Sequence, residues 1–219
     1  MASRPKQAEP RPTPRLYLVT PPIGDPLAFA AALSAALAAG DFAAVLLRLV
    51  EADERSQINR VKALAPIVQD KGAALLIDGR ADLVARSGAD GAHLTGIAAF
   101  HDALERLKPE RIVGAGGLLT RHDAMLAAET GADYVMFGEP NADGTRPSLS
   151  AVEERVEWWA EVFEVPCVAY AASLDEVAVL ARAGADFIAL GDWLGQDPQM
   201  IAATILQVSA ALRSPETAA

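Results

Sequence analysis

The amino-acid sequence predicts a single (β/α)8 barrel, an α/β fold in which eight parallel strands alternate with helices. The tripeptide Gly-Ala-Asp occurs three times, beginning at Gly88, Gly131 and Gly184, each time between an Ala-rich helical pattern and a short apolar run. Glycine can end a helix in the left-handed conformation without a steric cost, so each tripeptide is typical of a turn from helix to strand. The length of 219 residues also lies within the range of such barrels, whose lower limit is ~200 residues.

The predicted strands are apolar throughout instead of alternating with polar residues, as a sheet buried on both faces requires. They are Leu16 to Thr20, Ala43 to Arg48, Ala73 to Ile77, Gly91 to Leu94, Ile112 to Ala115, Tyr134 to Phe137, Cys167 to Tyr170 and Phe187 to Leu190.

Segments of helical periodicity lie between these strands and after the last one. They are Pro26 to Ala39, Arg55 to Lys71, Arg80 to Ser87, Ile97 to Leu107, Arg121 to Thr130, Leu149 to Phe163, Leu174 to Ala183 and Pro198 to Leu212. An open doubly wound sheet is the alternative fold. The barrel is favoured because Thr20-Pro21-Pro22 follows the first strand, where a dinucleotide-binding sheet would carry Gly-x-Gly-x-x-Gly.

The predicted domain organisation is one barrel over residues 16–213 between two short terminal segments. Residues 1–15 hold four prolines among charges and lack the apolar segment of a signal peptide, which predicts a disordered leader. Residues 214–219 are predicted to be a flexible tail.

Charge and composition restrict the class of partner. The net charge of -10 argues against nucleic acid and anionic membranes, which both attract basic surfaces. The apolar stretch from Leu27 to Gly40 is shorter than the roughly 20 residues needed to span a bilayer. A single cysteine, Cys167, lies in an apolar run; we expect a small core residue in a protein of the reducing cytoplasm.

In a (β/α)8 barrel, functional residues lie at the C-terminal ends of the strands. Arg48 ends an apolar strand between two leucines, which predicts either a ligand contact or a buried ion pair with Asp78 across the barrel mouth. Asp78 is also a candidate N-cap of the following helix or a metal ligand. Glu139 and Asn141 follow the sixth strand and are candidate ligand-binding residues.

Three further features have structural and functional interpretations. Gly116 and Gly117 give a Gly-rich fifth loop that can admit a phosphate. His93 lies inside a strand, and a hydrogen-bonded core histidine is the expectation. Trp158 and Trp159 are adjacent on an outer helix and cannot both face the barrel, so one of them is a candidate subunit contact of a homo-oligomer.

Several of these motifs, in this order, resemble thiamine phosphate synthase and its relative the thiazole tautomerase. They are Leu-Tyr-Leu-Val-Thr at 16–20, Leu-Arg at 47–48, Asp-Gly-Arg-Ala-Asp-Leu at 78–83 and Gly-Ala-Asp-Gly-Ala-His-Leu at 88–94. The similarity extends from about residue 16 to the last strand. It implies a barrel that joins a hydroxymethylpyrimidine diphosphate to a thiazole phosphate and releases pyrophosphate.

The resemblance implies roles for particular residues. Departure of a polyanion needs cations and, in an active synthase, Mg2+ held by carboxylates. Arg48 and Arg146 are the implied catalytic cations, and Asp78 is the implied Mg2+ ligand. The positions implied to hold the phosphorylated thiazole or pyrimidine are Gly116, Gly117, Gly138, Glu139, Asn141, Thr145, Ala171, Ala172, Ser173 and Gly191.

The chain also departs from the family pattern. A metal-binding aspartate of the family falls on Gly79, its Gly-Gly pair falls on Ala171 and Ala172, and a serine falls on Asp192. Synthase activity that is reduced or lost is therefore one expectation, and a non-catalytic barrel that binds a thiamine-pathway metabolite or a partner protein is the alternative. A weaker alternative is a thiazole tautomerase with His122, in the first turn of the fifth helix, as its base.

Overall fold

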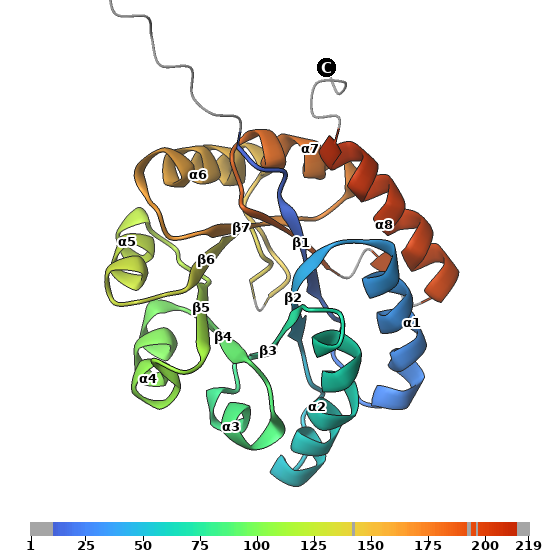
Figure 1. Cartoon of the computed structure of the whole chain (residues 1–219). Coiled ribbons are helices and arrows are strands. Elements are labelled where there is room, and N and C mark those ends of the chain that lie inside the picture. Colours follow the sequence, from blue (N-terminus) through green and yellow to red (C-terminus); the bar gives the residue numbers. More distant parts are fainter. Residues whose placement is uncertain (1–10, 142, 192–193, 196, 214–219) are drawn as a thin grey trace, which may run out of the picture.

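Eight parallel strands close into a barrel in the order β1 to β8 and are surrounded by helices (Figure 1). The computed structural model describes residues 11–141, 143–191, 194–195 and 197–213. The predicted (β/α)8 barrel is confirmed. Its strands are β1 (Arg15–Val19), β2 (Phe42–Leu47), β3 (Ala74–Asp78), β4 (Gly91–Thr95), β5 (Ile112–Gly116), β6 (Tyr134–Phe137), β7 (Cys167–Ala171) and β8 (Phe187–Leu190).

Each strand is followed by a helical segment. The segments are α1 (Pro26–Ala39), α2 (Glu54–Gln69), the 3-10 turn η1 (Ala81–Leu83) with α3 (Val84–Ser87), α4 (Ile97–Leu107), α5 (Arg121–Glu129), α6 (Leu149–Val162), α7 (Leu174–Arg182) and α8 (Pro198–Arg213). Most ends agree with the sequence prediction to within one or two residues.

The third helical segment and the start of the barrel differ from the prediction. The expected helix from Arg80 to Ser87 is split into η1 and a single turn of α3. The predicted leader ended at Arg15, but that residue belongs to β1, and Arg11 donates hydrogen bonds to the carbonyls of Ala160 (2.8 Å) and Gly184 (3.3 Å). Residues 11–15 are thus tied to the barrel, whereas residues 1–10 and 214–219 lie outside the described ranges.

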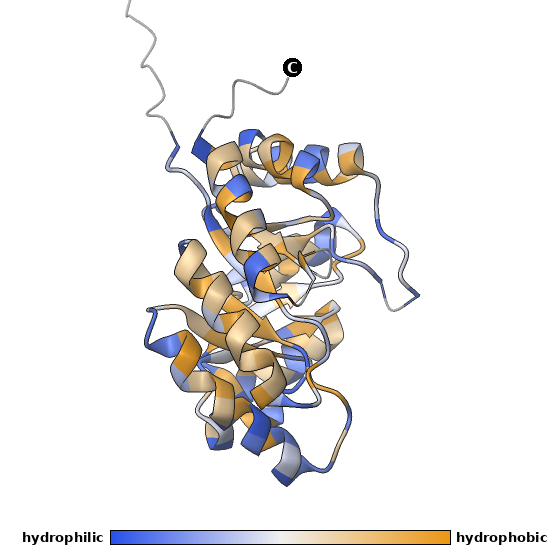
Figure 2. Ribbon diagram, turned by 90° about the vertical axis from the view of Figure 1, so that its right-hand side faces the viewer, coloured by the Kyte–Doolittle hydropathy of each residue, from blue (hydrophilic) through white to orange (hydrophobic). Residues whose placement is uncertain are grey.

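The strands carry apolar side chains on both faces because each face packs against a different layer. In β1, Leu16 and Leu18 pack outward among the helices, whereas Tyr17 and Val19 point into the barrel interior. In Figure 2, hydrophilic residues interrupt the mostly hydrophobic ribbon of the helices and are frequent near the helix ends. The inner layer is formed by Tyr17, Val19, Ala44, Leu46, Leu76, Tyr134, Met136, Val168, Tyr170 and Ala189.

The two adjacent tryptophans of α6 differ in burial, although their ring centroids lie 5.8 Å apart and Trp158 also packs against the core. Trp159 is buried, and its indole N–H donates to the Val165 carbonyl at 2.7 Å. Trp158 is partly buried beneath the guanidinium of Arg121, which lies 4.7 Å from its ring centroid. The contact between subunits stays a prediction.

Each Gly-Ala-Asp turn joins two neighbouring strands at the N-terminal end of the barrel. Gly88, Gly131 and Gly184 all have positive φ, as expected of helix-ending glycines. Asp90, which follows Gly88, then makes two bonds to Leu75 at the start of β3. Its carboxylate accepts from the Leu75 N–H (2.7 Å), and its own N–H donates to the Leu75 carbonyl (2.8 Å).

The same two-point contact recurs in the other two turns. Asp133 bonds Val113 at 2.7 and 2.9 Å, and Asp186 bonds Cys167 at 2.8 and 3.0 Å. Each aspartate therefore provides an acceptor for an N–H at the start of the preceding strand, one residue before the ladder between the two joined strands begins. The contacts link β3 to β4, β5 to β6 and β7 to β8.

A fourth aspartate joins β1 to β2 through a side chain. Asp41 accepts the Leu16 N–H on its backbone carbonyl at 2.9 Å, and its carboxylate pairs with the Arg15 guanidinium at 2.8 Å. Acidic side chains thus make contacts at the base of the barrel between β1 and β2, β3 and β4, β5 and β6, and β7 and β8.

Replacing Asp186 should lower the free energy of unfolding. Asp186→Ala leaves the Cys167 N–H without its acceptor, which typically costs about 1–3 kcal/mol. Asp186→Asn keeps an oxygen at this position and should cost less. Urea denaturation would measure both, with Asp102→Ala, at an exposed acid of α4, as the control. Equal stabilities of Asp186→Ala and Asp102→Ala would contradict the assignment.

Candidate active site

A polar pocket of about 80 Å3 lies at the C-terminal mouth of the barrel. It brings together three residues that the sequence places at strand ends, Arg48, Asp78 and Glu139. Its lining comes from the ends of six strands and the loops that follow them: Val19, Leu46, Arg48, Asp78, His93, Thr95, Met136, Glu139, Pro140 and Tyr170.

Arg48 is fixed on the pocket wall by the end of the neighbouring strand. Its Nε donates to the carbonyl of Thr20 at 2.7 Å, and its backbone N–H donates to the Thr20 hydroxyl at 3.1 Å. Thr20 is fully buried, so it holds the base of the Arg48 side chain in place. A guanidinium at this position supplies a preorganised positive charge at the mouth.

Asp78 ends β3 and faces the same pocket. Burial, the larger effect, raises the pKa of its carboxyl, while the charge of Arg48 acts to lower that pKa. The prediction that Asp78 caps the following helix is wrong, since η1 begins after Arg80 without a side-chain cap. The positive φ of Gly79, 66°, turns the chain between Asp78 and η1 instead.

Glu139 follows β6 and reaches across to the loop after β5. Its carboxylate oxygen Oε1 accepts the backbone N–H of Gly117. Burial raises the pKa of Glu139 to about 7, whereas the hydrogen bond from the Gly117 N–H acts to lower it. Glu139 therefore exchanges a proton near neutral pH, which is a property of acid–base groups at active sites.

Behind Glu139, three buried side chains form a hydrogen-bonded chain across the barrel. The Tyr134 hydroxyl lies 2.9 Å from His93 Nδ1 and 2.7 Å from the Tyr17 hydroxyl. Burial lowers the pKa of His93 to about 4, so the imidazole is neutral at physiological pH. The expectation of a hydrogen-bonded core histidine is confirmed. The chain leads from the mouth pocket to Tyr17, which lines an apolar pocket of about 230 Å3 at the N-terminal end of the barrel.

Gly116 makes room for the polar groups of the mouth. A Cβ at this position would lie 2.3 Å from Glu139 Oε1 and 2.5 Å from His93 Nε2. Its neighbour Gly117 has a φ of 58° and uses its N–H for Glu139. Both glycines were expected to admit a phosphate; in the structure this space is filled by Glu139 and His93, and phosphate binding there stays a prediction.

Arg146 lies outside the residues that line the pocket. It pairs with Glu176 of α7 through contacts of 2.7 and 3.0 Å, and its Nε donates to the Gly138 carbonyl at 3.2 Å. The second oxygen of Glu176 accepts the Ala172 N–H at 2.8 Å. Sequence reasoning missed Glu176, although the Ser-x-x-Glu spacing from 173 to 176 is typical of a glutamate that turns back to the backbone.

The remaining predicted binding residues surround the mouth. Ser173 is the N-cap residue of α7, but its side chain makes no capping bond. Asn141 and Thr145 are exposed and bond each other at 3.0 Å. Gly191 lets the Tyr170 ring approach, because a Cβ would lie 2.0 Å from the Tyr170 hydroxyl. Ala171, at the end of β7, is fully buried.

Two other predicted residues are not part of the pocket as described. His122 is exposed in the first turn of α5 and does not line the pocket. Asp192 lies outside the described residues. Their implied roles stay predictions.

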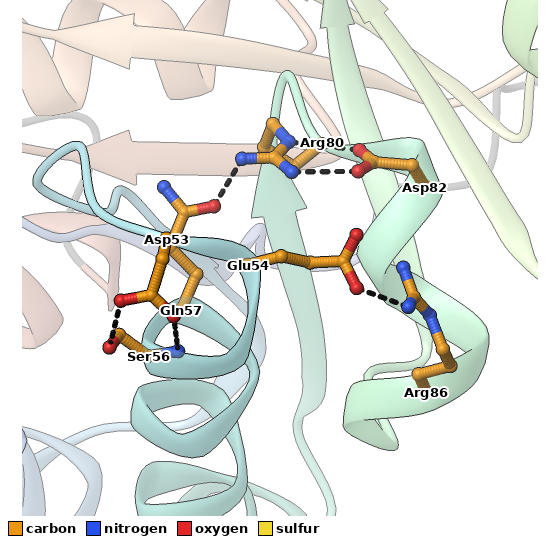
Figure 3. A network of polar contacts seen from close by, with 7 residues as sticks. All are labelled: Asp53, Glu54, Ser56, Gln57, Arg80, Asp82 and Arg86. Carbon is orange, nitrogen blue, oxygen red and sulfur yellow. Dashed lines mark hydrogen bonds and ion pairs between the residues drawn. The ribbon is translucent and has the colours of Figure 1, made fainter.

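The loop after β3 is held by a network of polar contacts from α2 (Figure 3). The Arg80 guanidinium bonds both oxygens of Asp82 at 2.7 and 2.9 Å and also donates to the buried Gln57. Glu54 pairs with Arg86 of α3. Arg80, the cation of the family motif, therefore ties this loop to α2, which explains why a regular helix does not start at that residue.

The described part of the chain offers few side chains that could bind a metal ion at the mouth pocket. No group of three or more His, Cys, Asp or Glu side chains there is arranged to hold a metal ion. Asp78 and Glu139 share the pocket with Arg48, whose positive charge disfavours a cation between them. The described residues alone therefore do not form a metal site, and the implied contact of Asp78 with Mg2+ stays a prediction.

The fold and site define a (β/α)8 barrel whose described residues place one guanidinium and two carboxyl groups in a small polar pocket at the C-terminal ends of the strands. The family model described as thiamine monophosphate synthase matches residues 16–193. The chain belongs to the thiamine monophosphate synthase family.

Individual relatives agree with this assignment. The chain is 42% identical over 202 residues to the thiamine-phosphate synthase of Rhodospirillum centenum, covering 91% of this chain and 98% of the relative. It is 39% identical to that of Hyphomonas neptunium, covering 87% and 90%. Among solved structures, the thiamine phosphate pyrophosphorylase from Pyrococcus furiosus shares the fold, with a TM-score of 0.73, 20% identity and coverage of 92% and 96%. None of the described helices is long and apolar enough to cross a membrane.

Gly116→Ala should disturb the mouth pocket. The added methyl group collides with Glu139 and His93, and overpacking of this kind typically costs about 1–3 kcal/mol. Gly24→Ala is the matched control, because its Cβ would meet nothing closer than 3.7 Å. Chemical denaturation measures both. Equal stability of the two variants would show that the pocket is less tightly packed than described.

The raised pKa of Glu139 should make the wild type lose stability as pH rises. The ordinary pKa of a glutamate is 4.5, and that of Glu139 in the folded protein is about 7. Between these pH values the unfolded chain loses the proton while the folded protein keeps it, so rising pH favours the unfolded state. Relative to Glu139→Gln, the wild type should become less stable from pH 5 to pH 8. His93 has the opposite dependence but is present in both proteins. A pH-independent difference in the free energy of unfolding would refute the assignment.

Proposed function

We propose that the chain is a thiamine phosphate synthase, which joins a hydroxymethylpyrimidine diphosphate to a thiazole phosphate and releases pyrophosphate. The observation that carries this proposal is family membership over nearly the whole barrel, with relatives of that name at up to 42% identity. The mouth pocket supports it, because the barrel places a fixed cation at the end where such folds carry out chemistry.

The reaction is a substitution at the methylene carbon of the pyrimidine. The carbon–oxygen bond breaks, and its electron pair leaves with pyrophosphate while the thiazole ring nitrogen forms the new bond to carbon. Negative charge grows on the leaving oxygen. Arg48, held by the Thr20 carbonyl, is the described pocket residue that can stabilise this charge without first reorganising. Met136 and Tyr170 provide the less polar walls on which an aromatic ring can pack.

Mg2+ would supply further charge neutralisation when bound to pyrophosphate. The described carboxyl groups do not form a metal site, so no step is assigned to it. Asp78 is the acid proposed to contact such an ion. The proposed compartment is the cytoplasm, where the buried thiol of Cys167 would remain reduced.

Incubation of the purified chain with both substrates, with and without Mg2+, should release pyrophosphate and form thiamine phosphate. Arg48→Ala should lower kcat/KM by about 10²–10³, as expected for loss of a charge-stabilising group. Arg121→Ala, an exposed change on α5, is the control and should retain activity. No product at high wild-type concentration would refute the synthase assignment.

One observation favours a non-catalytic barrel as the second candidate. The backbone N–H groups of Gly117 and Ala172, both expected to contact phosphate, already bond Glu139 and Glu176. Such a barrel would bind a thiamine-pathway metabolite without turnover. Thermal-shift measurements would then show stabilisation by the pyrimidine or thiazole phosphate in the absence of product formation.

A further inference from the structure

Two glutamates at the barrel mouth occupy positions expected for ligand phosphate. Glu176 accepts a hydrogen bond from the Ala172 N–H and forms an ion pair with Arg146 at 2.7 Å. Glu139, which lines the mouth pocket, accepts a hydrogen bond from the Gly117 N–H. The nearby guanidinium of Arg155 is engaged elsewhere, donating to the carbonyls of Leu118 (2.8 Å) and Leu119 (3.2 Å). Glu139 is thus a partly buried acid whose carboxyl group accepts a backbone N–H.

We propose that Glu139 is an internal competitor of the anionic ligand and determines the affinity of the mouth pocket for phosphate groups. Its carboxylate holds the Gly117 N–H and the space beside Gly116 that a phosphate oxygen would use. A phosphorylated ligand enters fully only when Glu139 is protonated or withdrawn. The inference rests on the proposed function for the identity of this ligand as a pyrophosphate ester.

The geometry makes simultaneous occupation unfavourable. Glu139 Oε1 lies 2.3 Å from the point that a Cβ of Gly116 would occupy, so no room remains there for a second oxygen. A carboxylate and a phosphate in one small, poorly solvated pocket also repel each other. Asp78 in the same pocket adds to this repulsion, whereas Arg48 opposes it.

Protonation of Glu139 removes the competing charge. The groups that act on it are the Gly117 N–H after β5, Arg155 on α6 and Asp78 on β3, while the neutral imidazole of His93 on β4 lies beside it. With a pKa of about 7, roughly a tenth of Glu139 is protonated at pH 8 and most of it at pH 6. The binding-competent fraction of the protein changes in the same proportion.

Isothermal titration of the full chain with inorganic pyrophosphate tests the proposal. At pH 8, Glu139→Gln should lower the Kd about tenfold relative to wild type, and at pH 6 by less than about twofold. Protonation of pyrophosphate itself affects every variant equally at a given pH. Glu154→Gln, which removes an exposed carboxylate of the same helix that carries Arg155, is the control and should match wild type.

The glutamine of Glu139→Gln can still accept the Gly117 N–H and fill the same space. Glu139→Ala provides a second test, because it removes this acceptor altogether. It should bind pyrophosphate more tightly than wild type at pH 8. Equal affinity of both Glu139 variants and the control would overturn the proposal. Absence of pyrophosphate binding in every variant would also overturn it, because removing the competitor should reveal the site.

The synthase assay separates this proposal from the proposed function. Turnover by wild type with no effect of Glu139 on pyrophosphate affinity refutes the competitor and leaves the synthase intact. Tighter pyrophosphate binding by Glu139→Gln in a chain that forms no product supports the competitor and refutes the synthase.

Discussion

The barrel depends on hydrogen bonds between neighbouring strands at its N-terminal rim. Asp90, Asp133 and Asp186 each bond both the N–H and the carbonyl of a residue on the preceding strand. These contacts fix the relative height of adjacent strands, and a fixed register is what brings side chains from different strands to one level at the opposite end. The mouth pocket, with its residues from six strands, is a consequence of this alignment.

The interior that this alignment creates is unusually polar for a barrel core. Tyr17, Tyr134 and His93 satisfy one another by hydrogen bonding where branched aliphatic side chains would be ordinary. Burial keeps the imidazole neutral and the tyrosines protonated. The same desolvation acts on Glu139 and Asp78 at the mouth, so the carboxyl groups of the site hold their protons more tightly than exposed acids do.

Much of the fold was predictable because strands and helices have different hydrophobic periods and because glycine marks the turns between them. The third helix was mispredicted, since its start is decided by contacts of Arg80 with Gln57 and Asp82 that the local pattern does not contain. The grouping of Arg48, Asp78 and Glu139 followed from their places at strand ends. Their interactions did not: the seat of Glu139 on Gly117 and the pair of Arg146 with Glu176 require the folded register.

The carboxylate contacts at the rim fall on alternate seams of the barrel. They join β1 to β2, β3 to β4, β5 to β6 and β7 to β8. Backbone bonds at the rim also close intervening seams: the Asp90 carbonyl accepts the Ile112 N–H at 3.0 Å, the Pro166 carbonyl the Val135 N–H at 3.1 Å, and the Asp186 carbonyl the Arg15 N–H at 3.3 Å. Loss of one of these carboxylates should therefore loosen the two strands that it joins before it affects the rest of the barrel, so that the opening stays local.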